Sequence, residues 1–277
     1  MPAPVPPYFD RLIADFHRGA GNRLVHLGYW ESPPAAGAAM AAEEFGRAQQ
    51  RLNDELVSLA DPAAGQAVLD VGCGFGGTLA GINAQCSGMQ LTGVNIDPRQ
   101  LAICAGLEAR NGNRLQWQEA DACALPFVDG SFDLVLCIEA MFHFSSRRAF
   151  FSEAARVLRP GGAMVCSDIS IDTTARRLDT PAFDIAAALQ NGYGPWPDVW
   201  SADADHPDIA RAAGLRMERR SDISANVMPS HGFTTPADAG DWIASDNAAL
   251  RAAMMLKWLH AESLLRYECF RFVKPAG

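Results

Sequence analysis

A short glycine-rich segment carries the clearest chemical signal in the chain. Residues 68–77 read Val-Leu-Asp-Val-Gly-Cys-Gly-Phe-Gly-Gly, an apolar strand that runs through Asp70 into glycines at the G-x-G-x-x-G spacing. Glycine lets the backbone approach a ligand, and the helix that follows offers free N–H groups at its N-terminus. The segment therefore predicts a nucleotide-sized ligand site, and the alternative is a glycine-rich turn that binds nothing.

Asp70 indicates which class of ligand this turn can bind. A carboxylate at the end of a buried strand is costly unless it meets a cation or several hydrogen-bond donors. The pyrophosphate of a dinucleotide would lie beside Asp70 and be repelled. A ligand with an ammonium group and a positively charged sulfur fits this position better.

Polar side chains also follow the next two apolar segments. Asn95, Asp97 and Gln100 lie about 20 residues beyond the glycines, where doubly wound folds hold ribose hydroxyls. A third apolar segment leads in the same way to Asp121. Several strands that end in polar groups at one sheet edge predict a single ligand-binding crevice.

The combined pattern LDVGCG…GVNID…DA…LRPGG, between residues 67 and 168, resembles the class I S-adenosylmethionine-dependent methyltransferases. The resemblance implies S-adenosylmethionine as the cofactor. The residues it assigns to the cofactor are Asp70, Gly72 and Gly74 at the methionine end, Asn95 and Gln100 at the ribose, and Ile96, Asp121 and Ala122 at the adenine. Asp97 is then expected to cap the helix that begins with Pro98.

Composition limits the function classes. The 277 residues carry a formal net charge of −9, which argues against a nucleic-acid substrate because phosphates demand a basic surface. The seven cysteines form no C-x-x-C pair and are expected to be reduced. No apolar run approaches the roughly 20 residues that span a bilayer, and the chain opens without a signal pattern. We expect a cytoplasmic protein that acts on a small molecule, with a homodimer possible.

The alternation of strand and helix patterns predicts an α/β fold, a Rossmann-like doubly wound sheet. The resemblance extends it to seven strands, the last antiparallel. The expected division is an N-terminal helical cap (1–60), a cofactor-binding core (61–171), a helical substrate lid (172–205) and a completion of the core with a helical cap segment (206–277). Within the last part, residues 236–265 are expected to be helical.

Methyl transfer is an in-line displacement that needs a positioned nucleophile, removal of its proton and exclusion of water, without a metal. His143, after the fourth strand, is the natural general base because an ordinary histidine is mostly neutral near pH 7. Asp168, expected at the end of the fifth strand, could orient it. Both positions resemble those of sugar and natural-product O-methyltransferases, although these often carry a second histidine where Phe142 stands. Glu139 could face the cofactor or accept backbone hydrogen bonds.

An N-terminal motif and several aromatic residues predict the rest of the site. Residues 26–30, His-Leu-Gly-Tyr-Trp, resemble an element that small-molecule methyltransferases place over the cofactor, so Tyr29 could contact it, or could pack on the core. Residues 222–230 resemble a segment near the substrate opening of sarcosine and phthiotriol methyltransferases. A large apolar pocket is expected from Met141, Phe142, Phe183, Tyr193, Trp196, Trp200 and Met228.

These observations favour methylation of a hydroxyl on a mostly apolar metabolite. One alternative is C-methylation of a prenyl chain or quinone, with Glu139 or an aromatic cage stabilising a cation and Mg²⁺ accompanying a diphosphate. A nicotinamide-dependent oxidoreductase is a second alternative, although the chain lacks a Tyr-x-x-x-Lys pair. A cofactor-binding module without catalytic activity is a third.

Overall fold

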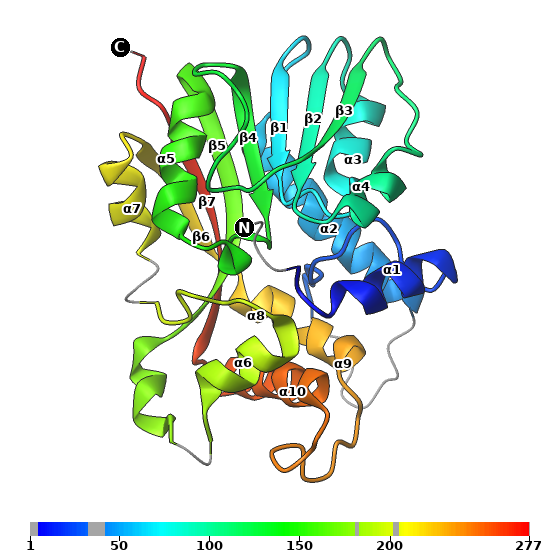
Figure 1. Ribbon diagram of the computed structural model, residues 1–277, viewed down its shortest axis with the longest axis vertical. Coiled ribbons are helices and arrows are strands. Elements are labelled where there is room, and N and C mark those ends of the chain that lie inside the picture. Colours follow the sequence, from blue (N-terminus) through cyan, green and yellow to red (C-terminus); the bar gives the residue numbers. More distant parts are fainter. Residues whose placement is uncertain (1–4, 33–41, 181–182, 202–204, 277) are drawn as a thin grey trace.

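The computed structural model describes residues 5–32, 42–180, 183–201 and 205–276. Its centre is a seven-stranded sheet in the order β3-β2-β1-β4-β5-β7-β6 (Figure 1). The strands are β1 (Ala67–Val71), β2 (Gln90–Asn95), β3 (Arg114–Glu119), β4 (Phe132–Ile138), β5 (Leu158–Ile171), β6 (Arg216–Asp222) and β7 (Leu265–Val273). Only β7 runs antiparallel to its neighbours. The predicted Rossmann-like fold with an antiparallel last strand is therefore confirmed.

The strand order reverses beside β1. This strand pairs with β2 on one side and with β4 on the other, both in parallel. In an open parallel sheet a ligand binds beyond the carboxyl ends of the strands at such a reversal. All five residues of β1 are buried, which is typical of a central parallel strand covered on both faces.

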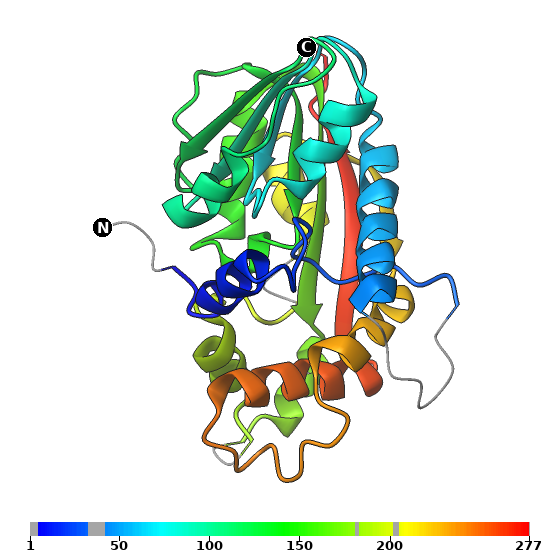
Figure 2. The same ribbon diagram turned by 90° about the vertical axis from the view of Figure 1, so that its right-hand side faces the viewer.

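Helices cover both faces of the sheet. They are α1 (Phe9–His17), α2 (Ala42–Ala60), α3 (Gly77–Gln85), α4 (Pro98–Cys104), α5 (Arg147–Val157), α6 (Ile185–Tyr193), α7 (His206–Ala212), α8 (Ser224–Val227), α9 (His231–Thr234) and α10 (Ala248–Ala261). Short 3₁₀ turns are η1 (Met141–His143), η2 (Thr173–Leu178) and η3 (Met228–Ser230). Side chains of α2 and α3 pack in one apolar cluster, and those of α5 and α7 pack in the cluster on the opposite face. Figure 2 shows α2 running alongside β7.

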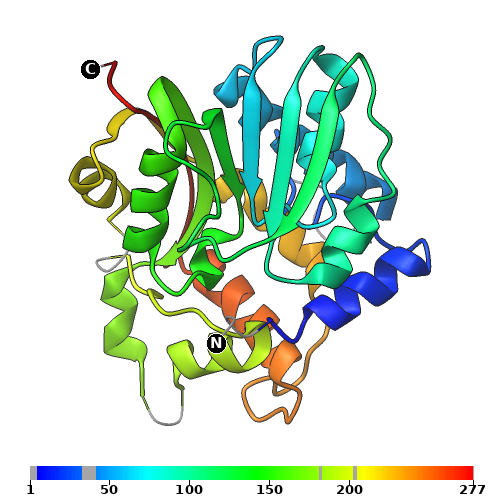
Figure 3. The same ribbon diagram turned by 45° about the horizontal axis from the view of Figure 1, so that its top comes forward.

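Two groups of helices lie beyond the carboxyl ends of the parallel strands. One group is α6 and α10, which pack so closely that a Cβ on Gly192 would lie 2.2 Å from the Cβ of Ala252. The other is α1, which lies beside α4 (Figure 3) and is tied to it by a 2.6 Å ion pair between Asp10 and Arg99. Helix α1 and the pair α6–α10 therefore approach the same sheet edge from different sides.

Two element boundaries differ from the expectation. Helix α10 begins at Ala248, and residues 236–247 form turns, because Asp238, Asp241 and Asn247 accept hydrogen bonds from backbone N–H groups instead of continuing a helix. Strand β5 continues to Ile171 because β7 pairs with it along residues 163–171. The longer β5 places Asp168 inside the strand rather than at its end.

Candidate active site

A cavity at the β1 edge collects most of the predicted cofactor residues. It contains about 1080 Å³ of space, open in part to solvent. On the sheet side its walls come from residues 70–74, 77–78, 94–96, 100, 120–122, 138–140 and 143–145, and on the side of the N-terminal segment from residues 6, 8, 9, 12 and 23–26. The N-terminal segment, expected from the sequence as a helical cap, thus contributes one wall of the cavity.

The glycine turn brings backbone to the cavity. Gly72 has φ +77°, and a Cβ there would lie 2.4 Å from the Cβ of Ala140. Gly74 has φ +53°, and its added Cβ would lie 2.8 Å from Cγ2 of Val25. Other residues are strained at such φ values and would not fit between these neighbours. The turn is therefore tightly packed against both η1 and the N-terminal segment.

Asp70 presents an uncompensated carboxylate to this cavity. The side chain is 3% exposed, and no described residue donates a hydrogen bond to it. Burial raises the pKa of Asp70 to about 7. A buried carboxylate without a partner favours a cationic ligand, which would stabilise its ionised form.

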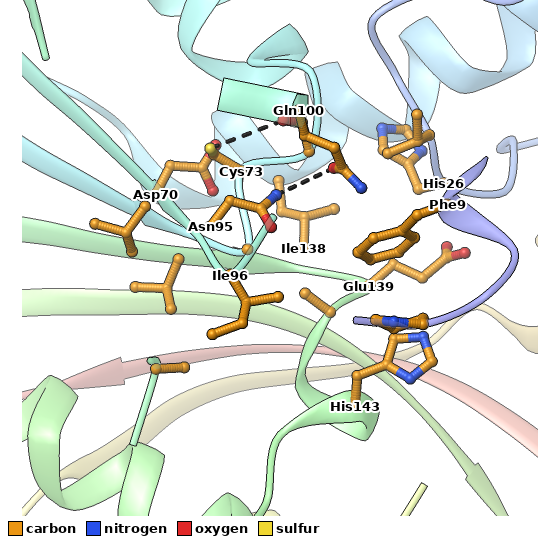
Figure 4. Close-up of a pocket in the computed structure, with 18 of the residues that line it drawn as sticks. Phe9, His26, Asp70, Cys73, Asn95, Ile96, Gln100, Ile138, Glu139 and His143 are labelled. Carbon is orange, nitrogen blue, oxygen red and sulfur yellow. Dashed lines mark hydrogen bonds between the residues drawn. The ribbon is translucent and has the colours of Figure 1, made fainter. Parts of the chain in front are cut away.

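Asn95 and Gln100, both expected to bind the ribose, differ in whether their side chains are free to bond a ligand (Figure 4). Asn95 Nδ2 donates to Gln100 Oε1 at 3.1 Å, and Asn95 Oδ1 accepts from the Asp97 amide at 3.1 Å. Gln100 Nε2 is buried and has no partner within the described chain. Gln100 is therefore the free donor, and Asn95 orients it. The predicted cap is present, because the Asp97 side chain accepts from the Arg99 amide at the start of α4.

The adenine-side residues line the same cavity. Ile96, Asp121 and Ala122 all contribute to the wall. Asp121 Oδ1 accepts a 2.8 Å hydrogen bond from the Cys123 amide, which leaves Oδ2 to accept from a ligand. Their contact with adenine stays a prediction.

His143 lies on the opposite side of the cavity, in η1. Its Nδ1 is 2.8 Å from the Pro195 carbonyl oxygen, and its Nε2 is 3.0 Å from the Tyr8 hydroxyl. A carbonyl oxygen only accepts, so Nδ1 carries the proton and Nε2 accepts from Tyr8. Burial lowers the pKa of His143 to about 4, so the ring is neutral near pH 7. The neutral ring has the tautomer that a general base at Nε2 requires.

Asp168 does not pair with His143, contrary to the expected dyad. Because β5 extends to Ile171, Asp168 lies within the strand, opposite Glu268 of β7. Its Oδ2 accepts from Arg147 Nε at 2.6 Å and from His206 Nε2 at 2.7 Å. These partners keep the pKa of Asp168 below its ordinary value despite the burial. The imidazole of His143 is held by a lid carbonyl instead.

Glu139 connects the N-terminal segment to the sheet. Its Oε2 accepts from the Leu27 amide at 3.0 Å and from the Tyr267 hydroxyl at 2.8 Å. The residue has φ +49° and lines the cavity between Ile138 and His143. Burial raises its pKa to about 7. The predicted backbone hydrogen bond is present, and contact with the cofactor or substrate stays a prediction.

The 26–30 motif reaches the cavity through a residue that the sequence analysis did not select. Tyr29 packs against the core and bonds α2 through its backbone, outside the cavity wall. His26 lines the cavity instead, with Nδ1 donating to the Leu27 carbonyl at 2.7 Å and a buried Nε2 without a described partner. Burial lowers its pKa to about 4, so this nitrogen is a free acceptor near pH 7. Tyr29 thus has the core-packing role that the sequence left open as an alternative, and His26 is the residue through which the motif reaches the cavity.

The predicted substrate residues form packing layers rather than the described cavity wall. Phe142 stacks on Trp196 with ring centroids 4.4 Å apart, and Phe183 packs edge-on against Trp258 at 5.1 Å. The others are Met141, fully buried; Tyr193, edge-on to Tyr8; Trp200, beneath Arg176; and Met228, 41% exposed. The apolar side chains that do line the cavity include Phe9, Leu12, Ile138 and Phe144. Contact of the predicted set with a substrate therefore requires a different arrangement from this one.

Comparisons with known proteins agree with the fold. Residues 69–166 match the family model described as a methyltransferase domain. The chain is 32% identical over 240 residues to methyltransferase GfsG of Streptomyces halstedii, which covers 83% of this chain and 81% of that protein. It is 31% identical over 223 residues to O-methyltransferase resE of Aspergillus sclerotiorum, covering 80% and 78%.

Solved structures share the whole fold at low identity. Geranyl diphosphate C-methyltransferase from Streptomyces coelicolor, solved with Mg²⁺, geranyl diphosphate and S-adenosyl-L-homocysteine, superposes with a TM-score of 0.71 at 16% identity, covering 99% of this chain and all of that one. The [4+2]-cyclase SpnF gives a TM-score of 0.69 at 22% identity, covering 98% and 94%.

The chain belongs to the class I S-adenosylmethionine-dependent methyltransferases, in the natural-product branch. It is an enzyme that uses S-adenosylmethionine as its cofactor.

The residues of the cavity fit this cofactor. The partnerless Asp70 carboxylate suits a cation, and the orphaned Gln100 Nε2 suits a hydroxyl oxygen. Within the described ranges no group of three or more His, Cys, Asp or Glu side chains could hold a metal ion. Within the same ranges no helix is long and apolar enough to cross a membrane.

Proposed function

We propose that the protein methylates a hydroxyl group of a mostly apolar small molecule, with His143 as the general base. The observation that carries this proposal is the 3.0 Å hydrogen bond from the Tyr8 hydroxyl to His143 Nε2. A hydroxyl group thus already lies where it can give its proton to a neutral imidazole inside the cavity. The name of O-methyltransferase resE, a relative that covers most of the chain, supports a hydroxyl acceptor.

Different residues of the cavity bind the cofactor, accept the proton and exclude water. Asp70, Gln100 and Asp121 would hold the cofactor, which supplies an electrophilic methyl group when bound. The acceptor hydroxyl replaces that of Tyr8 and donates to His143 Nε2, while Nδ1 stays bonded to Pro195. His143 Nε2 would take the proton that the acceptor hydroxyl loses as the methyl group passes from the cofactor's sulfonium sulfur to the acceptor oxygen; the sulfur would leave as a neutral thioether and the imidazole would become an imidazolium. Phe9, Leu12 and Phe144 exclude water from this exchange.

C-methylation of a prenyl or quinone-like substrate is the second candidate. The fold of geranyl diphosphate C-methyltransferase and the buried Glu139 carboxylate in the cavity wall favour it. The charge of the wall opposes a diphosphate substrate. Arg23 is the single arginine or lysine among the described lining residues, and its Nη1 already bonds the carbonyl oxygens of Phe75 and Ile103.

A product analysis with labelled methyl groups separates the two candidates. The purified protein would be incubated with ¹³C-methyl S-adenosylmethionine and a panel of phenols, aliphatic alcohols, quinols and prenyl diphosphates. We expect the label in an O–CH₃ group, identified by its carbon chemical shift. Label in a C–CH₃ group would overturn the hydroxyl assignment and leave C-methylation, with Glu139 as its first residue to test.

A further inference from the structure

A buried charge cluster lies behind the 172–205 segment. Arg147, the first residue of α5, and Asp168 of β5 form an ion pair whose side chains are 1% and 0% exposed. His206 of α7 bonds the same carboxylate oxygen, and Asp168 Oδ1 accepts from the Ile169 amide at 2.9 Å. Desolvating such a pair is costly, and replacing it by apolar residues is often neutral or stabilising. The cluster therefore calls for an explanation other than stability.

Arg147 extends this cluster to the segment that holds His143. Its Nη1 donates to the Asp198 carbonyl oxygen at 2.8 Å and lies 3.8 Å from the Asp198 carboxylate. Asp198 is three residues beyond Pro195, whose carbonyl bonds His143 Nδ1. Trp196, between them, is 1% exposed and stacks on Phe142, the residue before His143. A continuous chain of contacts therefore links Asp168 to the imidazole.

The residues that follow Asp198 are held by backbone hydrogen bonds to β5. Ile171 donates to the Val199 carbonyl at 3.0 Å, and Ser201 donates to the Ile171 carbonyl at 2.7 Å. On the Pro195 side, the Gly194 amide donates to the Gln190 carbonyl at 2.8 Å, and the Gln190 side chain lies 3.5 Å from the Trp196 carbonyl oxygen. The Arg147 bond to Asp198 is thus the side-chain bond that restrains the segment after Trp196.

We propose that Arg147 is a positioning residue for catalysis, which holds the Pro195–Asp198 segment so that the Pro195 carbonyl fixes His143 in the Nδ1–H tautomer. This inference rests on the proposed role of His143 as base. The planar guanidinium is needed because it donates to Asp168 and to Asp198 in different directions at once. Without that restraint the carbonyl moves, and Nε2 takes the proton in part of the molecules. A protonated Nε2 cannot accept a proton from the acceptor.

Nitrogen NMR of histidine tests the proposal directly. In wild-type protein with ¹⁵N-labelled histidine, the His143 signals, assigned by their loss in His143→Ala, should show a protonated Nδ1 and an unprotonated Nε2. A protonated Nε2 in the neutral wild-type ring would overturn the proposal without any variant. This measurement needs no substrate, so it fails or succeeds separately from the proposed hydroxyl chemistry.

The matched variants are Arg147→Lys and Arg148→Lys. Arg147→Lys keeps a cation beside Asp168 but loses the fork, so we expect a mixed tautomer at His143 and a roughly ten- to hundredfold lower kcat, part of the usual contribution of a base. S-adenosylmethionine affinity should stay within about twofold because Arg147 lies outside the cavity. Arg148 is exposed, and its variant should retain wild-type values. A folded Arg147→Lys protein with an unchanged tautomer and kcat would contradict the positioning role.

Discussion

His143 shows how a single residue in this site is prepared by its neighbours. The backbone carbonyl at Nδ1 selects the tautomer, burial keeps the ring neutral, and Tyr8 marks the position of a donor hydroxyl. None of these three features involves the Asp168 carboxylate, which the sequence suggested as the partner of His143. The residue type could be predicted from its place after β4, but its partners depend on segments distant in sequence.

Asp70 predicts a pH dependence of cofactor binding. Its raised pKa of about 7 means that the free site is partly protonated near neutrality, whereas a cationic ligand favours the ionised form. Binding should therefore release protons, and affinity for S-adenosylmethionine should rise about tenfold from pH 6 to pH 8. Calorimetry in buffers of different ionisation enthalpy measures both effects. Asp70→Asn should remove the pH dependence; if that variant keeps it, another group such as Glu139 is responsible.

Gln100 and Asn95 should act as one unit at the ribose. Gln100→Ala removes the free donor and should weaken cofactor binding by about 1 kcal/mol. Asn95→Ala should cost a similar amount, because Gln100 loses the bond that aims its amide at the cavity. The double variant should cost little more than either single variant. Titration of the variants, with exposed Gln50→Ala as control, checks this, and fully additive losses would show that Asn95 contacts the ligand itself.

At the scale of elements, α1 was expected as part of the N-terminal helical cap, but the residues with which it enters the cavity wall could not be predicted. Its helical pattern was visible, but its position depends on tertiary contacts such as the Asp10–Arg99 pair. These contacts join segments far apart in the chain, and no local signal encodes them. The boundary of β5 was missed for the same reason, because β7, which extends it, is the last strand of the chain. By contrast, the core strands and the Asp97 cap followed from local patterns.

The position of α1 predicts the effect of removing the Tyr8 hydroxyl. Tyr8 bonds the nitrogen that the acceptor needs, so Tyr8→Phe should lower the KM for the acceptor several-fold and leave kcat nearly unchanged. Steady-state kinetics with an accepted substrate measures this. Tyr29→Phe removes a hydroxyl outside the cavity and serves as the control. A hundredfold loss of kcat in Tyr8→Phe would instead make Tyr8 a participant in proton transfer.

At the scale of the whole molecule, buried histidines tie the C-terminal helical part together. His260 Nε2 donates to the Ser224 carbonyl, so its Nδ1 accepts from His231 Nε2 at 3.0 Å. These two hydrogen bonds connect α8, α9 and α10 through the two neutral imidazole rings. Burial lowers the pKa of His231 from 6.5 to about 3. The unfolded chain therefore takes up a proton on His231 before the folded protein does.

The His231–His260 link predicts an acid-labile contribution to stability. The contribution is fully present above pH 6.5 and is lost as the pH falls toward about 3. Between pH 7.5 and pH 5, the wild-type free energy of unfolding should fall by about 2 kcal/mol more than that of His231→Asn. Urea unfolding at both pH values measures the difference, with exposed His17→Asn as a control that follows the wild type. Parallel losses in wild type and His231→Asn would show that the link does not titrate as described.

The central claim is that His143 removes the acceptor's proton, and the kinetics of His143→Ala test it most directly. We expect a 10²- to 10⁴-fold lower kcat in this variant, with S-adenosylmethionine affinity nearly unchanged. Because burial lowers the pKa of His143 to about 4, the wild-type contribution of this base should stay constant from pH 6 to pH 8. Glu139→Gln, measured beside it, should retain more activity than His143→Ala. Near-normal turnover in His143→Ala, together with its loss in Glu139→Gln, would contradict the account.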